Sequence, residues 1–186
     1  METSENPTLP EPTFTQTHQT FIQTYQKIID STAFQTFQKD HPDAELVAGF
    51  FILDFLDETA NQRALDFKDK EQIFTFSLNQ QNEITLKEDK LIETTTHPQL
   101  TKIQPETKVE LNELKSIVGT KALDEGVKDK FQKIIAVLQK HGDKQIWNLT
   151  CMLENMVILN ILIDCNTEEI IKFDKKNMMD FIKQKK

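Results

Sequence analysis

The sequence is short of arginine, since Arg63 is the only arginine among its 22 basic residues. Lysine offers a point charge where arginine offers a planar fork, so most routes to two-pronged recognition of phosphate or carboxylate are missing. The formal net charge of -8 also argues against a nucleic-acid-binding protein, because such binding relies on clustered Lys and Arg. The one basic cluster, the terminal KQKK, is typical of a solvated tail.

Glycine is scarce as well, with only 4 in 186 residues. Phosphate loops and dinucleotide-binding turns need closely spaced glycines, and neither motif is present. The four histidines, at positions 18, 41, 97 and 141, lack the H-x-H or H-x-x-x-H spacing of a local pair of metal ligands. We therefore expect no metal, no cofactor and no enzyme activity.

No apolar run reaches the length of a transmembrane helix, and the opening METSENPTLPEPTFTQ lacks the basic and apolar segments of a signal peptide. Unless a leader has been removed, this predicts a cytoplasmic protein with no membrane partner. Cys151 and Cys165 lie about seven residues apart along the expected hairpin, more than ~20 Å at ~3.3 Å per residue. A disulfide needs Cα atoms within about 7 Å, so two free thiols are predicted, as in a reducing compartment.

Composition divides the chain into four parts. Residues 1–13 are rich in proline and polar residues, which predicts a disordered tail. Residues 14–90 are expected to form a first helix-plus-sheet unit, residues 91–108 a linker, and residues 109–186 a second unit. The predicted fold class is therefore α+β, with two helix-plus-antiparallel-sheet units packed as one or two small domains.

The first unit begins with apolar residues at helical spacing from residue 15 to residue 39. This stripe drifts near Thr32, where we expect the helix to bend or restart, and the HP pair at 41–42 ends it. Three strands are predicted to follow: AELVAGFFILDFL (44–56), buried on both faces, QIFTFSL (72–78), and EITLKE (83–88).

The second unit opens with VELNELKSIVGTKALDE (109–125), a predicted helix weakened by Gly119. The next segment, FQKIIAVLQK (131–140), has two interpretations. Its apolar residues recur at helical spacing, yet IIAVL is also typical of a buried strand.

Two predicted strands and a final helix complete the second unit. QIWNLTCML (145–153) alternates, with Trp147 and Leu149 on its apolar face, and a tight EN connection leads to MVILNILID (156–164). CNTEE then turns into IIKF (170–173), and the predicted final helix contains Met178, Met179, Phe181 and Ile182.

The stretches VLQKHGDKQIWNLT (137–150) and LNILIDCNTEEII (159–171) contain a strand with a central tryptophan and a strand ending in ID, followed by a turn. This order resembles the PepSY-like pattern. The whole chain, including HPDAEL (41–46), is similar to small uncharacterised archaeal proteins with two PepSY-like units. The resemblance implies that residues 131–140 form a strand, and that the protein has a non-catalytic binding or inhibitory role.

The turn of that pattern has the form D-x-x-T-G-x. Asp164 and Thr167 match it, but Glu168 stands at the glycine position, which puts the usual left-handed turn in doubt. The acidic clusters LDFLDE (53–58) and DCNTEE (164–169) both fall where strands should turn. We interpret their acids as solvated turn residues rather than as metal ligands.

The leading functional hypothesis is a non-enzymatic module that binds a protein or peptide through its sheets or by strand addition at an exposed edge, with an inhibitory or regulatory role. The alternative is a small-molecule-binding protein or enzyme with a pocket between helix and sheet. The candidate ligand contacts for that pocket are Phe50, Phe74, Phe76 and Trp147, although a place in the core is the preferred interpretation of these aromatics.

Overall fold

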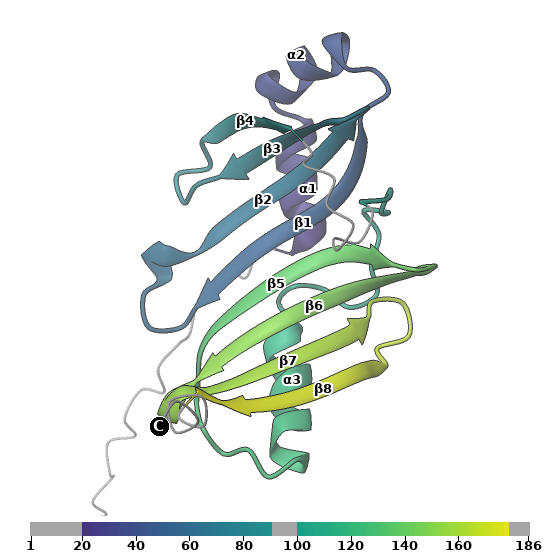
Figure 1. Cartoon of the computed structure of the whole chain (residues 1–186). Helices are drawn as coiled ribbons and strands as arrows, with labels where there is room; N and C mark the ends of the chain where they lie inside the picture. The colour runs from purple at the N-terminus through teal and green to yellow at the C-terminus, as the bar shows by residue number, and fades with distance from the viewer. Residues whose placement is uncertain (1–19, 91–99, 179–186) are drawn as a thin grey trace, which may run out of the picture.

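The computed structural model describes residues 20–90 and 100–178 (Figure 1). These residues form three α-helices, eight β-strands and two single-turn 3-10 helices. In chain order, the elements are α1 (Phe21–Ile29), α2 (Thr32–Asp40), β1 (Glu45–Asp54), η1 (Glu58–Ala60), β2 (Gln62–Asp69), β3 (Gln72–Leu78), β4 (Ile84–Lys90), α3 (Leu114–Asp124), β5 (Phe131–His141), β6 (Lys144–Leu153), η2 (Glu154–Met156), β7 (Val157–Asp164) and β8 (Ile170–Asn177).

All eight strands of the described residues form one antiparallel sheet, in the order β4-β3-β2-β1-β5-β6-β7-β8. The chain starts at the centre with β1 and adds β2, β3 and β4 outward. It then returns to the centre for β5 and adds the remaining strands on the other side. The predicted α+β class with an antiparallel sheet is therefore confirmed.

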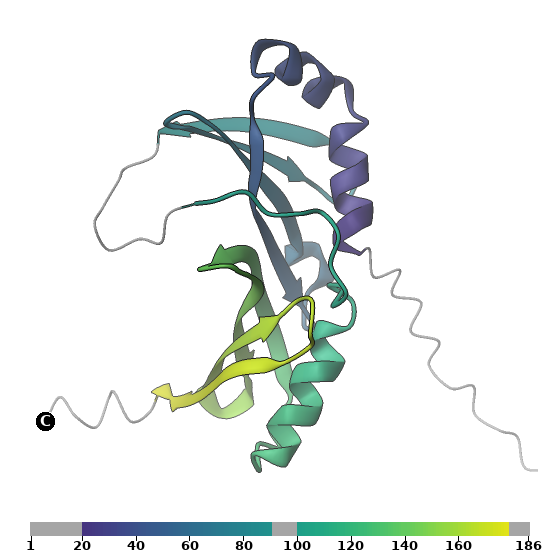
Figure 2. The same cartoon turned by 90° about the vertical axis from the view of Figure 1, so that its right-hand side faces the viewer.

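The three helices of the described residues all cover the same face of the sheet (Figure 2). Helices α1 and α2 pack on the half formed by β1–β4, and α3 lies along the half formed by β5–β8. Phe51 of β1 points to this helix side, where its ring centroid lies 6.0 Å from that of Phe21 in α1. Because side chains alternate along a strand, Phe50 points to the opposite face.

Gly49 of β1 allows α1 to pack close to the sheet. A Cβ atom at this position would lie 3.0 Å from the ring of Phe51 and 3.1 Å from that of Phe21. Both distances are shorter than ordinary van der Waals contacts, so a side chain would push the Phe21 ring, and α1 with it, away from the core.

The predicted first helix is divided into α1 and α2. Ser31 starts the second helix, because its hydroxyl accepts a hydrogen bond from the Phe34 N–H at 3.1 Å and caps the new N-terminus. The predicted drift near Thr32 is thus a complete break, and α2 ends just before the HP pair as expected.

Strand β2 has no counterpart among the predicted strands, although it pairs with β1 and β3 near the middle of the first half. Its sequence, QRALDFKD, carries charges on both faces and only two large apolar residues, Leu65 and Phe67, both buried. Two large apolar residues are too few for the sequence pattern to predict a strand. Much of the packing that stabilises β2 comes from the side chains of the neighbouring strands.

Residues 131–141 form strand β5, as the resemblance implies, and the helical interpretation is wrong. Ile134, Ala136 and Leu138 are fully buried on the helix side, while Ile135 and Val137 are half-buried on the other face. A central strand bears apolar residues on both faces, so its sequence loses the alternation that identifies a half-exposed strand.

Part of the predicted linker is a packed element of the fold. Ile103 is only 1% exposed, and its N–H donates to the Leu46 carbonyl at 2.9 Å, in the part of β1 that lies beyond its register with β5. The Gln104 N–H donates to Gln145 Oε1 at 2.7 Å, and the Gln104 carbonyl accepts from Gln145 Nε2 at 2.9 Å. Residues 100–104 therefore fill the wedge where β1 and β5 diverge, before the chain passes to the helix side (Figure 2).

Residues 100–113 form the crossing segment between the two halves of the sheet. Residues 108–110 of this segment are hydrogen-bonded to both halves. The N–H groups of Lys108 and Val109 donate to the Cys165 carbonyl at 2.9 and 3.0 Å. The Glu110 carboxylate accepts a hydrogen bond from the Phe21 N–H at 2.9 Å, at the first turn of α1. A carboxylate is favoured there, because the N-terminus of a helix carries unsatisfied N–H groups and a partial positive charge.

The turn between β7 and β8 keeps the left-handed conformation without a glycine. Glu168 has a φ of 65°, and its N–H donates to the Asp164 carbonyl at 3.0 Å. The doubt raised by Glu168 is thus settled in favour of the usual turn geometry, at some cost in backbone strain.

The predicted tail, residues 1–13, and the predicted final helix from Met179 onward lie outside the described residues, as do residues 91–99 of the linker. Within the described ranges, none of the helices combines the length and the apolar character needed to cross a bilayer.

We expect Ile103→Ala to lower the free energy of unfolding by about 2–4 kcal/mol, because it opens a cavity at the wedge between the two halves. The matched control is Thr101→Ala, at an exposed neighbouring position, with an effect within about 0.5 kcal/mol. Urea unfolding followed by tryptophan fluorescence measures both. Equal effects of the two substitutions would show that the crossing segment does not hold the halves together.

We expect Glu168→Gly to raise the free energy of unfolding by about 0.5–1 kcal/mol, because glycine adopts a positive φ without strain and loses only part of that gain to chain entropy. Glu169→Gly, at the next position, should lower it. Thermal unfolding of the two variants checks the difference, and stabilisation by both would mean that the backbone of this turn is not the cause.

Candidate functional site

The four aromatic residues predicted to contact a ligand do not lie together. Phe74 and Phe76 pack beneath α2, with ring centroids 4.8 and 5.2 Å from that of Phe37. Trp147 is fully buried, and its indole N–H donates to the Val109 carbonyl at 2.8 Å. These three belong to the core, as the preferred interpretation had it, and only Phe50 lies on the uncovered face.

The uncovered face is the side of the sheet opposite the three described helices, and Figure 1 looks onto it. The register places side chains in rows across this face, and their central members are half-buried and largely apolar. The two central rows are Ala64, Phe50, Val137, Asn148, Leu162 and Lys172, and Gln62, Ile52, Ile135, Thr150, Asn160 and Asp174.

Both outer strands of the sheet carry charges. Strand β4 has Lys87, Glu88 and Asp89, and strand β8 has Lys172, Asp174, Lys175 and Lys176. Charged side chains along an edge oppose pairing with a further strand. Strand addition is therefore disfavoured at both edges.

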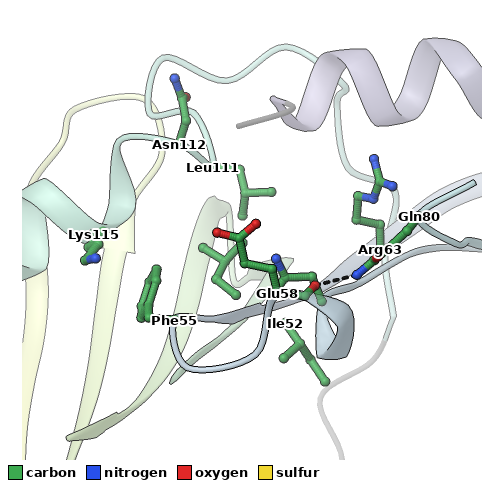
Figure 3. Close-up of a pocket in the computed structure, with 10 residues that line it drawn as sticks. Ile52, Phe55, Glu58, Arg63, Gln80, Leu111, Asn112 and Lys115 are labelled. Atoms are coloured by element: carbon green, nitrogen blue, oxygen red, sulfur yellow. Dashed lines mark hydrogen bonds between the residues drawn. The ribbon is translucent and has the colours of Figure 1, made fainter. Parts of the chain in front are cut away.

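A cavity of about 310 Å³ lies on the other side of the molecule, between the β1–β2 connection and the start of α3 (Figure 3). Its floor is apolar and its rim is polar. It is lined by Ile52, Leu53, Phe55, Glu58, Asn61, Arg63, Gln80, Leu111, Asn112 and Lys115.

The one arginine of the sequence lines this cavity. Arg63 is half-buried in β2, and one Nη donates to the Asn79 carbonyl at 2.9 Å, in the turn between β3 and β4. Burial lowers the pKa of its guanidinium from the ordinary value, because desolvation disfavours the charged form. From the next residue of that turn, the Gln80 side-chain amide donates to the Glu58 carbonyl, so the same turn positions both Arg63 and the η1 segment (Figure 3).

Opposite Arg63, Lys115 and Phe55 form a cation–π pair. The Lys115 Nζ lies 3.8 Å from the centroid of the Phe55 ring, which links the first turn of α3 to the residue after β1. The sequence does single out Arg63, as its one arginine. It gives no signal for Phe55 or Lys115, because they are 60 positions apart and meet only through the tertiary fold.

The two acidic clusters are turn structures, as predicted, but their first members are not solvated. Asp54 is 7% exposed and accepts hydrogen bonds from the N–H groups of Leu56 and Asp57. Asp164 is 4% exposed and accepts from those of Asn166 and Thr167. The exposed Glu168 and Glu169 do match the prediction.

Each buried aspartate also meets a lysine, Lys133 at 2.9 Å from Asp54 and Lys144 at 3.3 Å from Asp164. Backbone hydrogen bonds, first those from Asp57 and from Asn166, lower the pKa of Asp54 and Asp164, and the lysines add to the effect. Both groups are therefore carboxylates at neutral pH, each fixed by backbone N–H donors and by a lysine.

The cysteines are two free, buried thiols, as predicted. Cys151 faces the core of β6, and Cys165 follows β7 and donates from Sγ to the Gln145 carbonyl at 2.8 Å. Burial raises the pKa of each thiol to about 12, so neither is a thiolate nucleophile at neutral pH.

His18 and His97 lie outside the described residues. His41 caps the end of α2, and its Nδ1 lies 2.7 Å from Asp69 Oδ2, with the ring against Phe37 and Phe74. Across residues 20–90 and 100–178, no three His, Cys, Asp or Glu side chains come together as a metal site.

The lowered pKa values of Asp54 and Asp164 give a stability contribution that is present above the ordinary aspartate pKa of about 3.9 and is lost as the pH falls through the lower folded-state values. We expect the free energy of unfolding to decrease below about pH 4. The double variant Asp54→Asn, Asp164→Asn should be less stable than the wild type at pH 7 and lose less stability in acid.

Thermal unfolding between neutral and acid pH measures this, with Asp43→Asn as a control that removes an exposed carboxylate. A double variant whose stability falls in acid as steeply as that of the wild type would contradict the assignment.

No protein-family model and no curated protein matches this sequence, so the PepSY-like resemblance stays a prediction. Among solved structures, the chain is similar to the crystal structure of a "putative lipoprotein" from Clostridium difficile 630, with a TM-score of 0.53 and 16% sequence identity. The similarity covers 77% of this chain and 90% of that chain. At this level of identity the likeness shows a shared fold, and the chain therefore has the same α+β architecture as that protein.

Proposed function

We propose that the protein is a non-enzymatic binding protein that holds a protein or peptide on the uncovered face of its sheet. The observation that carries this proposal is the row Phe50, Val137 and Leu162, half-buried apolar side chains on a face that none of the described helices covers. Apolar side chains gathered on one face of a sheet are typical of interaction sites, and Asn148 is the one polar residue between Val137 and Leu162 in this row.

The surroundings of this apolar row favour a protein over a nucleic acid. Asn148, Thr150 and Asn160 lie among the apolar residues. Charges of both signs stand toward the outer parts of the face, such as Asp66 in β2 and Lys172 and Asp174 in β8. An apolar centre with a polar rim is the usual anatomy of a protein interface.

One carboxylate on this face supports a recognition role. Burial raises the pKa of Asp66, whose carboxylate accepts a hydrogen bond from the Thr75 hydroxyl at 2.6 Å. A half-buried carboxylate without a cationic partner in these contacts costs stability, and such groups cluster at functional sites.

We further propose that the two halves of the chain are two PepSY-like units and that binding is inhibitory or regulatory. The division of the helices supports the first point, because α1 and α2 precede and cover the meander β1–β4, and α3 precedes and covers β5–β8. The cytoplasmic location stays a prediction from the sequence.

A photo-reactive amino acid placed at Val137 tests the proposal in cells of the source organism. We expect discrete protein adducts from this position and none from Thr120, an exposed position on α3. The adducts should disappear when Leu162→Lys is added, because the new charge lies in the same row as Val137, with only Asn148 between them, and on the same face without entering the core.

Circular dichroism confirms that the Leu162→Lys protein is folded. Identical adducts from positions 137 and 120, or adducts that survive Leu162→Lys in a folded protein, would contradict docking on the uncovered face.

A further inference from the structure

The cavity beside α3 differs from the uncovered face in shape and chemistry, and the proposed function does not use it. Its floor contains the buried Leu111 with half-buried Leu53 and Phe55, while Glu58 and Asn112 are exposed at its rim. Its volume of about 310 Å³ is at the lower end of the range of roughly 300–1,000 Å³ for ligand pockets. An apolar floor, convergent polar groups and a small volume together favour a small amphipathic molecule.

The positive groups of the cavity favour a carboxylate. Arg63 has five N–H donors in a planar fork, and the hydrogen bond to Asn79 accounts for one Nη. The guanidinium is already partly desolvated, so an ion pair there is screened less than at the open surface. Arg63 thus keeps further N–H donors with which a planar guanidinium can bind a carboxylate in a two-pronged way.

The start of α3 adds to this preference. Leu111, Asn112 and Lys115 line the cavity around the first helical residue, Leu114, and no acidic residue stands in the first turn. The Glu113 side chain makes no cap, because its carboxylate accepts the Glu110 N–H at 2.8 Å instead. Lys115, in the first turn of α3, therefore adds a second positive charge to the lining of the cavity.

The Glu58 carboxylate disfavours a ligand that carries only negative charge, and it indicates which second charged group the ligand has. Its side chain lies between the Phe55–Lys115 pair and Arg63 (Figure 3). A ligand that carries only negative charge would be repelled by this carboxylate, whereas a ligand that also bears an ammonium group gains from it. The charges of the cavity are thus those that complement a zwitterion.

We propose that the cavity binds a free α-amino acid with an apolar side chain. Arg63 holds the carboxylate, Glu58 at the rim faces the ammonium group, and Leu53, Phe55 and Leu111 enclose the side chain. The amides of Asn61, Gln80 and Asn112 supply further donors and acceptors around the polar end. This site is separate from the one proposed for a protein or peptide, and either can fail without the other.

Isothermal titration calorimetry with the full chain and L-leucine as the probe tests the site. We expect one molecule to bind per chain, and two analogues to bind at least about tenfold more weakly, because each lacks one charged contact. The analogues are 4-methylpentanoate, which has no ammonium group, and 3-methylbutylamine, which has no carboxylate.

Three variants assign the roles. Arg63→Gln should weaken L-leucine binding at least about tenfold, and Arg63→Lys should lose less, because it keeps the charge and loses only the fork. Glu58→Gln should abolish the preference for L-leucine over 4-methylpentanoate. Lys87→Gln, which removes a cation on the exposed edge strand β4, should bind like the wild type.

Thermal unfolding shows whether each variant is folded, and the conservative Arg63→Lys keeps the test valid if Arg63→Gln is not. The proposal is wrong if L-leucine, L-isoleucine, L-methionine and L-phenylalanine all fail to bind at millimolar concentration. It is also wrong if 4-methylpentanoate binds as well as L-leucine, or if folded Arg63 variants bind like the wild type.

Discussion

The pairing of β1 with β5 is the contact on which the rest of the structure depends. It makes one sheet of two meanders, yet its register runs only from Gly49 and Leu138 to Asp54 and Lys133. Beyond Gly49 the strands diverge, and unpaired backbone groups would be left in the interior, which is costly. The crossing segment removes part of this cost, because the Ile103 N–H donates to the Leu46 carbonyl of β1. The Gln145 side chain in turn hydrogen-bonds to both backbone groups of Gln104 in the crossing segment.

The same crossing explains why α3 lies on the same face of the sheet as α1 and α2. The chain leaves β4 at one outer edge and has to reach β5 at the centre, and it passes through the wedge to the helix side before α3 begins (Figure 2). Trp147 and Glu110 then join the crossing to β6 and to α1. As a result, the described helices leave the opposite face of the sheet uncovered, and a small cavity forms where α3 starts beside the β1–β2 connection.

Buried charge in this protein is of two physical kinds. Asp54 and Asp164 are surrounded by N–H donors and a lysine each, so their charge stabilises turns at the ends of two strands. Arg63 and Asp66 are partly desolvated, and burial shifts the pKa of each toward the neutral form. Charges that cost stability are better guides to binding than charges that provide it.

The sequence by itself determined the fold class, the break of the first helix, the alternation of β6 and the absence of a disulfide, because each rests on residues close together in the chain or on local geometry. It could not separate strand from helix at residues 131–140, since a central strand is apolar on both faces. It also missed β2, whose two core residues gain their meaning only from neighbouring strands. Of the four predicted ligand contacts, Phe50 alone lies on a surface of the folded protein, and the other three lie in the core.

Only the tertiary structure decided the two candidate sites. The uncovered face depends on which side of the sheet the helices occupy, and no local pattern encodes that choice. The cavity brings together Phe55, the residue after β1, Arg63 of β2 and Lys115 of α3, and Lys115 is far from the other two in the sequence. The physical reason is that antiparallel pairing and the crossing through the wedge set these positions, and both are long-range interactions.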